Sequence, residues 1–312
     1  MTDPYVRDDV RAILIAIEAA GQPPLGSMSA AATRAMYQEM RGASDLDVGP
    51  LAVIRDIELA GGAGTIAARL FDAQAERGPG PVIVYFHGGG FVVGDLDSHA
   101  ALCGEMARVM DLPVVSVAYR LAPEDPFPAA PDDCEAAARW LVDHGAKIGR
   151  EATGLILAGD SAGANLAIVT AIGLRDKAAA VPVIAQALFY PVTEPIRDEG
   201  SAHEFATGYM LTRTGMAWFE ELYGAAGGDY RHEPLSVSQA GMPPTLVMTA
   251  SLDPLRDQGR RYAAACADAG VEAHYLEAAG TIHGFATMRR FMPSGQADVA
   301  RFLSELKGMI GR

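Results

Sequence analysis

The sequence predicts an α/β protein with a mainly parallel, eight-stranded sheet that carries helices on both faces. Eight short runs rich in apolar and β-branched residues occur along the 312 residues, and helix-length stretches separate most of the later ones. Half of the residues are hydrophobic and 21% are charged. This composition supplies a packed core and differs from that of disordered chains.

The chain begins with two predicted helices. The first starts near Asp8 and stops at Gly21, because Ile13 and Ile17 fall on one face of a helix in this stretch and glycine favours a helix end. The second spans about residues 29–41. Both precede the first predicted strand.

Two strands, residues 51–59 and 65–71, are predicted to form a hairpin. The turn between them holds Gly61, Gly62 and Gly64, which can take the positive φ that a tight reversal needs. The other six strands are separated mostly by helix-length segments. They are predicted at residues 82–86, 114–118, 155–158, 184–189, 245–249 and 273–276.

Charge and composition exclude several classes of protein. Lys and Arg number 25 and Asp and Glu 39, which gives a net charge of −14. The sequence also lacks the basic cluster with which proteins bind nucleic acid. No apolar run approaches the roughly 18 to 20 residues of a membrane span. Three scattered cysteines, Cys103, Cys134 and Cys266, indicate neither a disulfide framework nor a metal site, and we expect them in the core. Without a signal-peptide pattern, a cytoplasmic location is expected.

Ligands bind at the carboxyl ends of strands in parallel sheets, so the residues there carry the functional prediction. Strand 155–158 is followed by Gly159-Asp160-Ser161-Ala162-Gly163 and then by a predicted helix. A sharp strand-to-helix turn of this GxSxG type lifts the serine hydroxyl above the sheet, which favours Ser161 as a nucleophile. The alternative is that Ser161 only caps the helix.

A serine nucleophile needs a base to accept its proton. In this type of sheet the chain order is serine, acid, histidine, and four histidines follow Ser161. His203 and His232 precede the last two strands and His274 lies within one, whereas His283 lies past the last strand. We therefore predict His283 as the base.

The acid that orients the base is predicted at Asp253, just past the carboxyl end of strand 245–249. Pro254 biases this residue away from helical backbone. Asp257 would instead lie in the first turn of the next helix, where a carboxylate interacts with the helix dipole without a catalytic role.

Donors for an oxyanion are predicted in the glycine run Gly88-Gly89-Gly90 after strand 82–86. Glycine amides can approach a substrate carbonyl closely. We assign the donors to Gly89, Gly90 and Ala162, with Gly88 as the competing assignment. His87 is expected to hold the loop in shape, because it precedes Ser161 in the chain.

With these motifs together, the chain resembles the bacterial esterase branch of the hormone-sensitive lipase family of α/β hydrolases, from about residue 81 to 310. The motifs that carry the resemblance lie in the family's order and approximate spacing. They are His87-Gly88-Gly89-Gly90-Phe91, Tyr119-Arg120-Leu121-Ala122-Pro123-Glu124, Phe127-Pro128-Ala129-Ala130, Gly159-Asp160-Ser161-Ala162-Gly163 and Asp253-Pro254-Leu255.

The resemblance implies an α/β-hydrolase fold and hydrolysis of small carboxylic esters through an acyl-enzyme, with no metal or organic cofactor. It implies a helical cap from residues 1–48 and 192–238, and a catalytic domain from residues 49–191 and 239–312. The cap would include the aromatic stretch around Trp218 and Phe219. Members of the family are often dimers, so a homodimer is one expectation.

Two alternative functions remain on the same fold. One is a ligand-binding protein without activity, which the presence of His283 argues against. The other is an amidase or peptidase using the same triad, since leaving-group preference depends on proton transfer within the site. For the esterase we expect short acyl chains, because an acidic sequence gives no reason for binding at a lipid surface.

Overall fold

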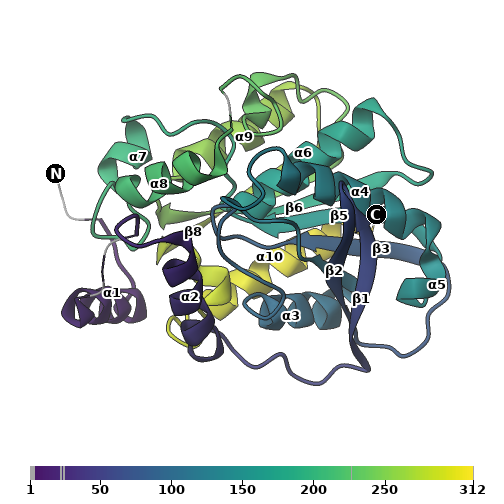
Figure 1. The fold of residues 1–312 in the computed structure, drawn as a ribbon, viewed down its shortest axis with the longest axis horizontal. Coiled ribbons are helices and arrows are strands. Elements are labelled where there is room, and N and C mark those ends of the chain that lie inside the picture. The colour runs from purple at the N-terminus through teal and green to yellow at the C-terminus, as the bar shows by residue number, and fades with distance from the viewer. Residues whose placement is uncertain (1–3, 22, 24, 226, 312) are drawn as a thin grey trace.

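Eight strands form one sheet in the order β1-β2-β4-β3-β5-β6-β7-β8 in this computed structural model, which describes residues 4–21, 23, 25–225 and 227–311 (Figure 1). The strands are β1 Val53–Gly61, β2 Gly64–Asp72, β3 Gly80–Phe86, β4 Val114–Val117, β5 Ala152–Asp160, β6 Val183–Phe189, β7 Thr245–Leu252 and β8 Ala273–Ile282. β2 is antiparallel to β1 and to β4, and all other pairs are parallel. The predicted α/β fold and its eight strands are confirmed.

The hairpin of β1 and β2 differs in its turn from the prediction. Of the three turn glycines, all of them described, Gly64 alone takes a positive φ, of 148°. Gly61 and Gly62 are needed for a close approach instead, because a Cβ on either would lie 2.7 Å from Asp133 Oδ1 or Asp132 Cβ respectively. Glycine therefore serves this turn mainly by letting it pack against the neighbouring helix.

Helices cover both faces of the sheet. They are α3 Ala100–Met110 and α10 Gly295–Ile310 on one face, and α4 Ala129–Asp143, α6 Ala162–Asp176 and α9 Arg256–Asp268 on the other (Figure 1). Side chains along β5 alternate between the two cores, with Leu155 and Leu157 in one and Ile156 and Ala158 in the other. The short helix α5 Gly145–Ile148 precedes β5.

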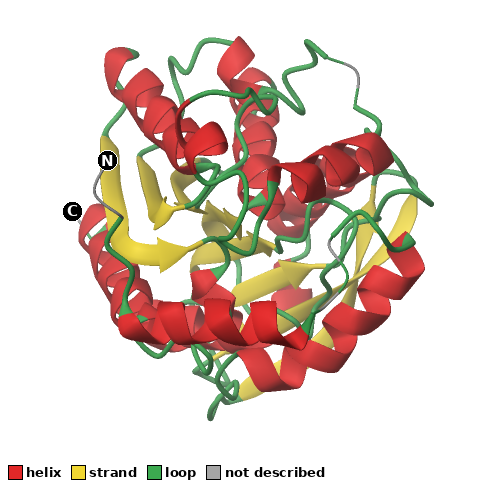
Figure 2. Ribbon diagram, turned by 90° about the vertical axis from the view of Figure 1, so that its left-hand side faces the viewer, coloured by secondary structure: helices red, strands yellow, loops and turns green. Residues whose placement is uncertain are grey.

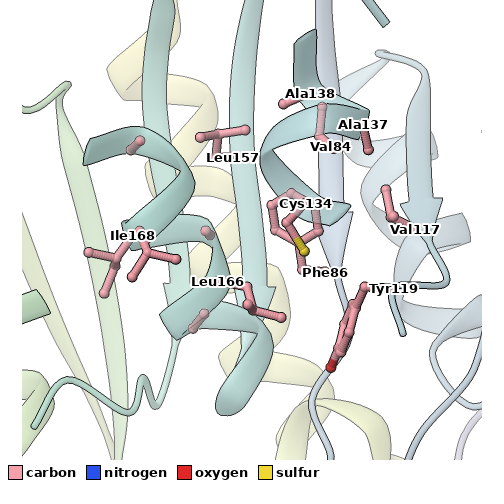
Figure 3. Close-up of a cluster of buried hydrophobic side chains, with 14 of the residues drawn as sticks. Val84, Phe86, Val117, Tyr119, Cys134, Ala137, Ala138, Leu157, Leu166 and Ile168 are labelled. Atoms are coloured by element: carbon pink, nitrogen blue, oxygen red, sulfur yellow. The ribbon is translucent and has the colours of Figure 1, made fainter. Parts of the chain in front are cut away.

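One of these cores is shown in Figure 3. Leu157 and Phe86 of the sheet, Leu166 and Ile168 of α6, and Cys134 of α4 belong to this buried cluster. All three cysteines are buried and unpaired, as predicted. Both faces of the central strands are thus dry, which explains why their sequences are almost continuously apolar.

The remaining helices lie together at one side of the molecule, which faces the viewer in Figure 2. They are α1 Asp8–Ala20, α2 Ala30–Ser44, α7 Gly200–Glu204 and α8 Arg213–Tyr223. Two short 3-10 turns, η1 Pro234–Ser236 and η2 Phe285–Thr287, come later in the chain. Gly26 and Trp218 are in contact across this group, because a Cβ on Gly26 would lie 3.1 Å from Trp218 Cβ.

Helices α1, α2, α7 and α8 fall within the ranges predicted as cap, 1–48 and 192–238, and that division stays a prediction. Residues 1–3, 22, 24, 226 and 312 of the predicted domains lie outside the described residues. The first helix ends as predicted, at Gly21 with φ of 57°. Among the helices that the structure describes, none combines the length and apolarity needed to span a membrane.

Candidate active site

The turn from β5 into α6 holds Ser161 in a strained conformation, with φ 54° and ψ −119°. Small residues make the turn possible, since a Cβ on Gly159 would lie 2.4 Å from the Gly163 carbonyl oxygen. A Cβ on Gly163 would lie 2.0 Å from the Phe86 carbonyl oxygen. The Ser161 side chain caps none of the described helix amides, so the capping interpretation is wrong.

The Ser161 hydroxyl instead lies beside His283, with 2.9 Å between Oγ and Nε2. β8 is longer than predicted, because its pairing with β7 continues through an irregularity to Leu252 and Ile282. His283 therefore follows the strand directly and is not carried on a flexible loop. The His283 side chain is 10% exposed.

Asp253 follows β7 and completes the line of contacts. Its Oδ2 lies 2.7 Å from His283 Nδ1, and its Oδ1 accepts a hydrogen bond of 2.8 Å from the Leu255 amide. The carboxyl group is fully buried. The competing Asp257 lies in the first turn of α9, as predicted, and accepts from the Ser201 amide at 2.9 Å.

The other three candidate histidines have partners elsewhere. His203 lies on α7 beside Asp198, and His274 contacts Glu305 and Glu272 at the start of β8. His232 is buried against the ring of Tyr223. The structure thus joins Ser161, His283 and Asp253 and leaves the alternatives apart.

The glycine run lies beside the serine turn, and the structure separates its members. The Gly88 amide donates to Asp160 Oδ1 at 2.8 Å, so it is already engaged within the protein. Gly89 and Gly90 take positive φ values of 119° and 60°. Ala162 is the first residue of α6, where backbone amides have no partner within the helix. The assignment of donors to Gly89, Gly90 and Ala162 stays a prediction.

His87 supports the glycine run, in line with its expected role. Its ring stacks on Tyr119 at 4.4 Å, and its Nδ1 lies 2.8 Å from the Gly88 carbonyl oxygen. The Tyr119 hydroxyl donates to the His87 carbonyl oxygen at 2.7 Å. Burial, together with the charge of the nearby His99, lowers the pKa of His87 to about 4. His87 is therefore a neutral, buried support.

Sequence reasoning missed Tyr190, which follows β6. Its ring packs 4.5 Å from the imidazole of His283, and its backbone has φ 36° although it is not glycine. Its amide donates to the Met248 carbonyl oxygen at 2.6 Å. Nothing in the local sequence signals this conformation, since a tyrosine at a strand end is ordinary.

Side chains of the predicted cap reach the same region. A Cβ on Gly90 would lie 2.4 Å from the ring of Phe219, and Met210 Cε lies 3.4 Å from the corresponding position on Gly284. Tyr223, at the end of α8, stacks on Phe91 with 3.9 Å between ring centroids. The glycine run and the residue after His283 are thus in contact with α8 and the segment before it.

A cleft of about 450 Å³ opens beside this site. It is lined by Arg34, Tyr37, Gln38, Gly94, Asp95, Ser98, Leu121, Glu124 and Asp125. Gly94 links this cleft to the glycine run, because a Cβ on Gly94 would lie 2.5 Å from the Gly88 carbonyl oxygen. Within the described part of the chain, no group of three or more His, Cys, Asp or Glu side chains could hold a metal ion.

Comparison with known families agrees with this geometry. The family model described as alpha/beta hydrolase fold matches residues 83–287, about two thirds of the chain. The chain belongs to the α/β-hydrolase family. Within it, the similarity to bacterial esterases places the chain in the hormone-sensitive lipase family, as the motifs predicted.

Individual relatives of this α/β hydrolase are named as esterases. It is 36% identical over 282 residues to Esterase LipI of Mycobacterium tuberculosis, covering 88% of this chain and 87% of the relative. It is 38% identical over 213 residues to an ethyl acetate hydrolase of Pseudomonas putida, covering 67% of each. The solved structure of an ester-hydrolase from the Lake Arreo metagenome is similar over 98% of this chain and all of that chain, with a TM-score of 0.93 and 35% identity.

Proposed function

We propose that this α/β hydrolase, a carboxylic ester hydrolase by family, cleaves short-chain acyl esters through an acyl-enzyme on Ser161. His283 acts first as base and then as acid. Asp253 holds the imidazole in the tautomer that carries its proton on Nδ1 and leaves Nε2 free to accept one. The amides of Gly89, Gly90 and Ala162 stabilise the oxyanion. One observation carries the proposal: the unbroken line from Ser161 Oγ through His283 to buried Asp253.

The reaction has two halves. In the first, Ser161 Oγ attacks the ester carbonyl while its proton passes to His283 Nε2, and the carbonyl oxygen becomes the oxyanion. Collapse of this intermediate breaks the bond to the alcohol, which leaves with the proton from His283. In the second half, His283 takes a proton from water, the hydroxide attacks the acyl carbonyl, and Ser161 leaves with that proton as the carboxylic acid is released.

The strain at Ser161 supports the nucleophilic role. A residue with side chain at φ 54° and ψ −119° costs on the order of 1–3 kcal/mol, and this cost aims Oγ at His283 Nε2 instead of at the helix amides. The helix dipole of α6 begins at the same point and favours the negative charge that develops there.

The test is hydrolysis of 4-nitrophenyl acetate and butyrate by the native protein and by Ser161→Ala. We expect turnover by the native protein and a loss of at least about 10⁴-fold in kcat in the variant. Equal turnover by both proteins, or none by the native protein, would remove the proposal. The 4-nitroanilide of butyric acid, run beside the ester, reports whether the site prefers an amide, as the alternative amidase would.

We also propose that the cap limits acyl length, with Phe219 over Gly90 as the nearest wall. A series of 4-nitrophenyl esters from two to sixteen carbons should then peak at short chains. The matched variants are Phe219→Ala and Trp218→Ala, because neighbouring Trp218 packs on Gly26 within the predicted cap. We expect only Phe219→Ala to move the optimum to longer chains. A native optimum on long emulsified lipids would contradict the proposal.

A further inference from the structure

A second, buried pair of histidine and aspartate lies at the serine turn, and the proposed mechanism does not use it. Asp160, the residue before Ser161, and His99, at the start of α3, lie 3.1 Å apart between Oδ1 and Nε2. Their side chains are 6% and 7% exposed. A buried carboxylate must be paired or hydrogen-bonded, so this contact calls for a physical account.

Asp160 collects three donors on one oxygen. Its Oδ1 accepts from the Tyr85 hydroxyl at 2.7 Å and from the Gly88 amide at 2.8 Å, besides facing His99. The carboxylate thus fastens the first glycine of the oxyanion loop to the residue that precedes the nucleophile. The fit is tight, because a Cβ on Gly88 would lie 2.4 Å from Asp160 Oδ2.

The contacts of His99 determine how many protons it carries. Its Nδ1 lies 2.9 Å from Ser98 Oγ, and that hydroxyl already donates to the Asp95 carbonyl oxygen at 2.8 Å. With its hydrogen on the Asp95 carbonyl oxygen, Ser98 Oγ accepts from Nδ1, while Nε2 faces the Asp160 carboxylate. The Gly88 amide also lies 3.3 Å from Nε2, but its contact with Asp160 is the shorter one. In this arrangement both ring nitrogens face acceptors, which favours an imidazolium.

From this geometry we propose that His99 and Asp160 form a buried imidazolium–carboxylate pair that holds the oxyanion loop in register with Ser161. His99 is a positioning residue, and it acts on the reaction only through Asp160 and Gly88. The inference rests on the proposed function, since a loop that binds no oxyanion would need no such register. Loss of the His99 proton would then misplace the donors at Gly89 and Gly90.

The electrostatic surroundings agree with this pair. Burial acts to lower the pKa of His99, but the charge of Asp160 and the hydrogen bond to it leave that pKa raised. Burial acts to raise the pKa of Asp160, but the charge of His99 and the bonds from His99, Tyr85 and Gly88 leave it lowered. The titratable and charged groups around His99 are Asp160, Tyr85, the neutral ring of His87 at 5.6 Å, Asp95, and Asp45 with its partner Arg289.

The expected signature is an alkaline limb in the dependence of kcat on pH. Activity should fall as pH rises through the pKa of His99, which gives the alkaline limb of a bell-shaped profile. His99→Gln should lower kcat about 10- to 100-fold with KM within about twofold, because the loop is displaced while the substrate pocket remains. It should also lose the alkaline limb.

Asp160→Asn is the second variant, since it keeps the shape and an oxygen that can accept from Gly88. Without the negative charge the proton on His99 is held less firmly, so the alkaline limb should move to lower pH by about one unit or more. A purely structural role for Asp160 would not move the limb. This variant keeps the inference testable if His99→Gln fails to fold.

The matched control is His274→Gln. His274 also has both ring nitrogens beside carboxylates, Glu305 and Glu272, but it lies at the far end of β8, roughly 30 Å from the site. It should leave kcat and both limbs unchanged. Native kcat and limbs in His99→Gln and Asp160→Asn would overturn the inference while the loss in Ser161→Ala leaves the proposed function standing. Native activity in Ser161→Ala would instead remove the proposed function.

Discussion

Two pairs of histidine and aspartate lie on either side of Ser161, and they differ in what faces the second ring nitrogen. His283 contacts Asp253 through Nδ1, and its Nε2 faces the Ser161 hydroxyl, which can donate. His99 contacts Asp160 through Nε2, and its Nδ1 faces a hydroxyl whose hydrogen is already used. The first arrangement suits a neutral base, and the second suits a fixed cation.

The difference shows that residue types alone do not define a catalytic role. Both aspartates are buried at the carboxyl ends of strands of the same sheet, Asp160 as the last residue of β5 and Asp253 just after β7. Only the partner of the second nitrogen separates a group that can move a proton from one that holds a loop.

The largest effect is expected for Asp253→Asn. The asparagine would present its amide to His283 Nδ1 and favour the tautomer that cannot accept a proton from Ser161, so kcat should fall about 10⁴-fold. The same substitution at Asp160 should cost only about 10- to 100-fold. Steady-state kinetics on an acetyl ester compares the two, and equal losses would erase the distinction between the pairs.

A smaller loss, about 100-fold in kcat, is expected for Gly88→Ala. The added Cβ would lie 2.4 Å from Asp160 Oδ2 and 3.0 Å from the Asp160 carbonyl oxygen, so the loop must leave the serine turn. Gly78→Ala is the control, because it has neither a positive φ nor any atom within 4 Å of its Cβ position. Kinetics and circular dichroism on both variants test this, and native activity in Gly88→Ala would argue against the Asp160 contact.

The sequence predicted those parts of the site that depend on short-range patterns. The strand-turn-helix around Ser161 follows from apolar runs and small residues, and the order of serine, acid and histidine selected Asp253 and His283. The last strand was found but shortened, because β8 continues through Gly280 and a pairing irregularity that its composition does not signal. Local patterns thus gave the positions of elements better than their ends.

The pair of His99 and Asp160 could not be predicted in the same way. Asp160 stands at the variable position of GxSxG. His99 lies 61 residues before it, immediately before α3, so only the folded sheet brings the two together. Tyr190 was missed because its local sequence signals neither its positive φ nor its ring contact with His283. The contact from the Gly88 amide to Asp160, which bears on the choice between Gly88 and its neighbours, likewise depends on the fold.

A prediction about stability follows from the neighbouring rings of His87 and His99. The folded-state pKa of His87, lowered to about 4, lies below its unfolded value near 6.5, so the unfolded chain binds the extra proton between these pH values. Stability is then lost as pH falls from about 6.5 toward 4, by about 2 kcal/mol between pH 7 and 5. His99 has the opposite sign, since its raised pKa stabilises the fold at low pH and that contribution disappears as pH rises through it.

Urea unfolding at pH 7, 6 and 5 measures how the free energy of unfolding depends on pH. His87→Gln cannot take up the proton, so its stability should change less over this range than that of the native protein, by about 2 kcal/mol. His274→Gln should keep the native dependence. If the unfolding free energy of His87→Gln depends on pH as strongly as that of the native protein, burial does not hold His87 neutral.

The smallest effect is expected where a carboxylate pairs at the surface. Arg34 of α2 donates to Glu124 at 2.6 Å, but the Glu124 side chain is 59% exposed, so water screens the pair and Glu124→Gln should cost about 0.5 kcal/mol of unfolding free energy. Arg34 also donates to the carbonyl oxygens of Val92 and Ala122, which keeps α2 attached in that variant. Activity should therefore be unchanged. A loss of activity comparable to that of Asp160→Asn would show that exposure, contrary to this comparison, does not separate the two carboxylates.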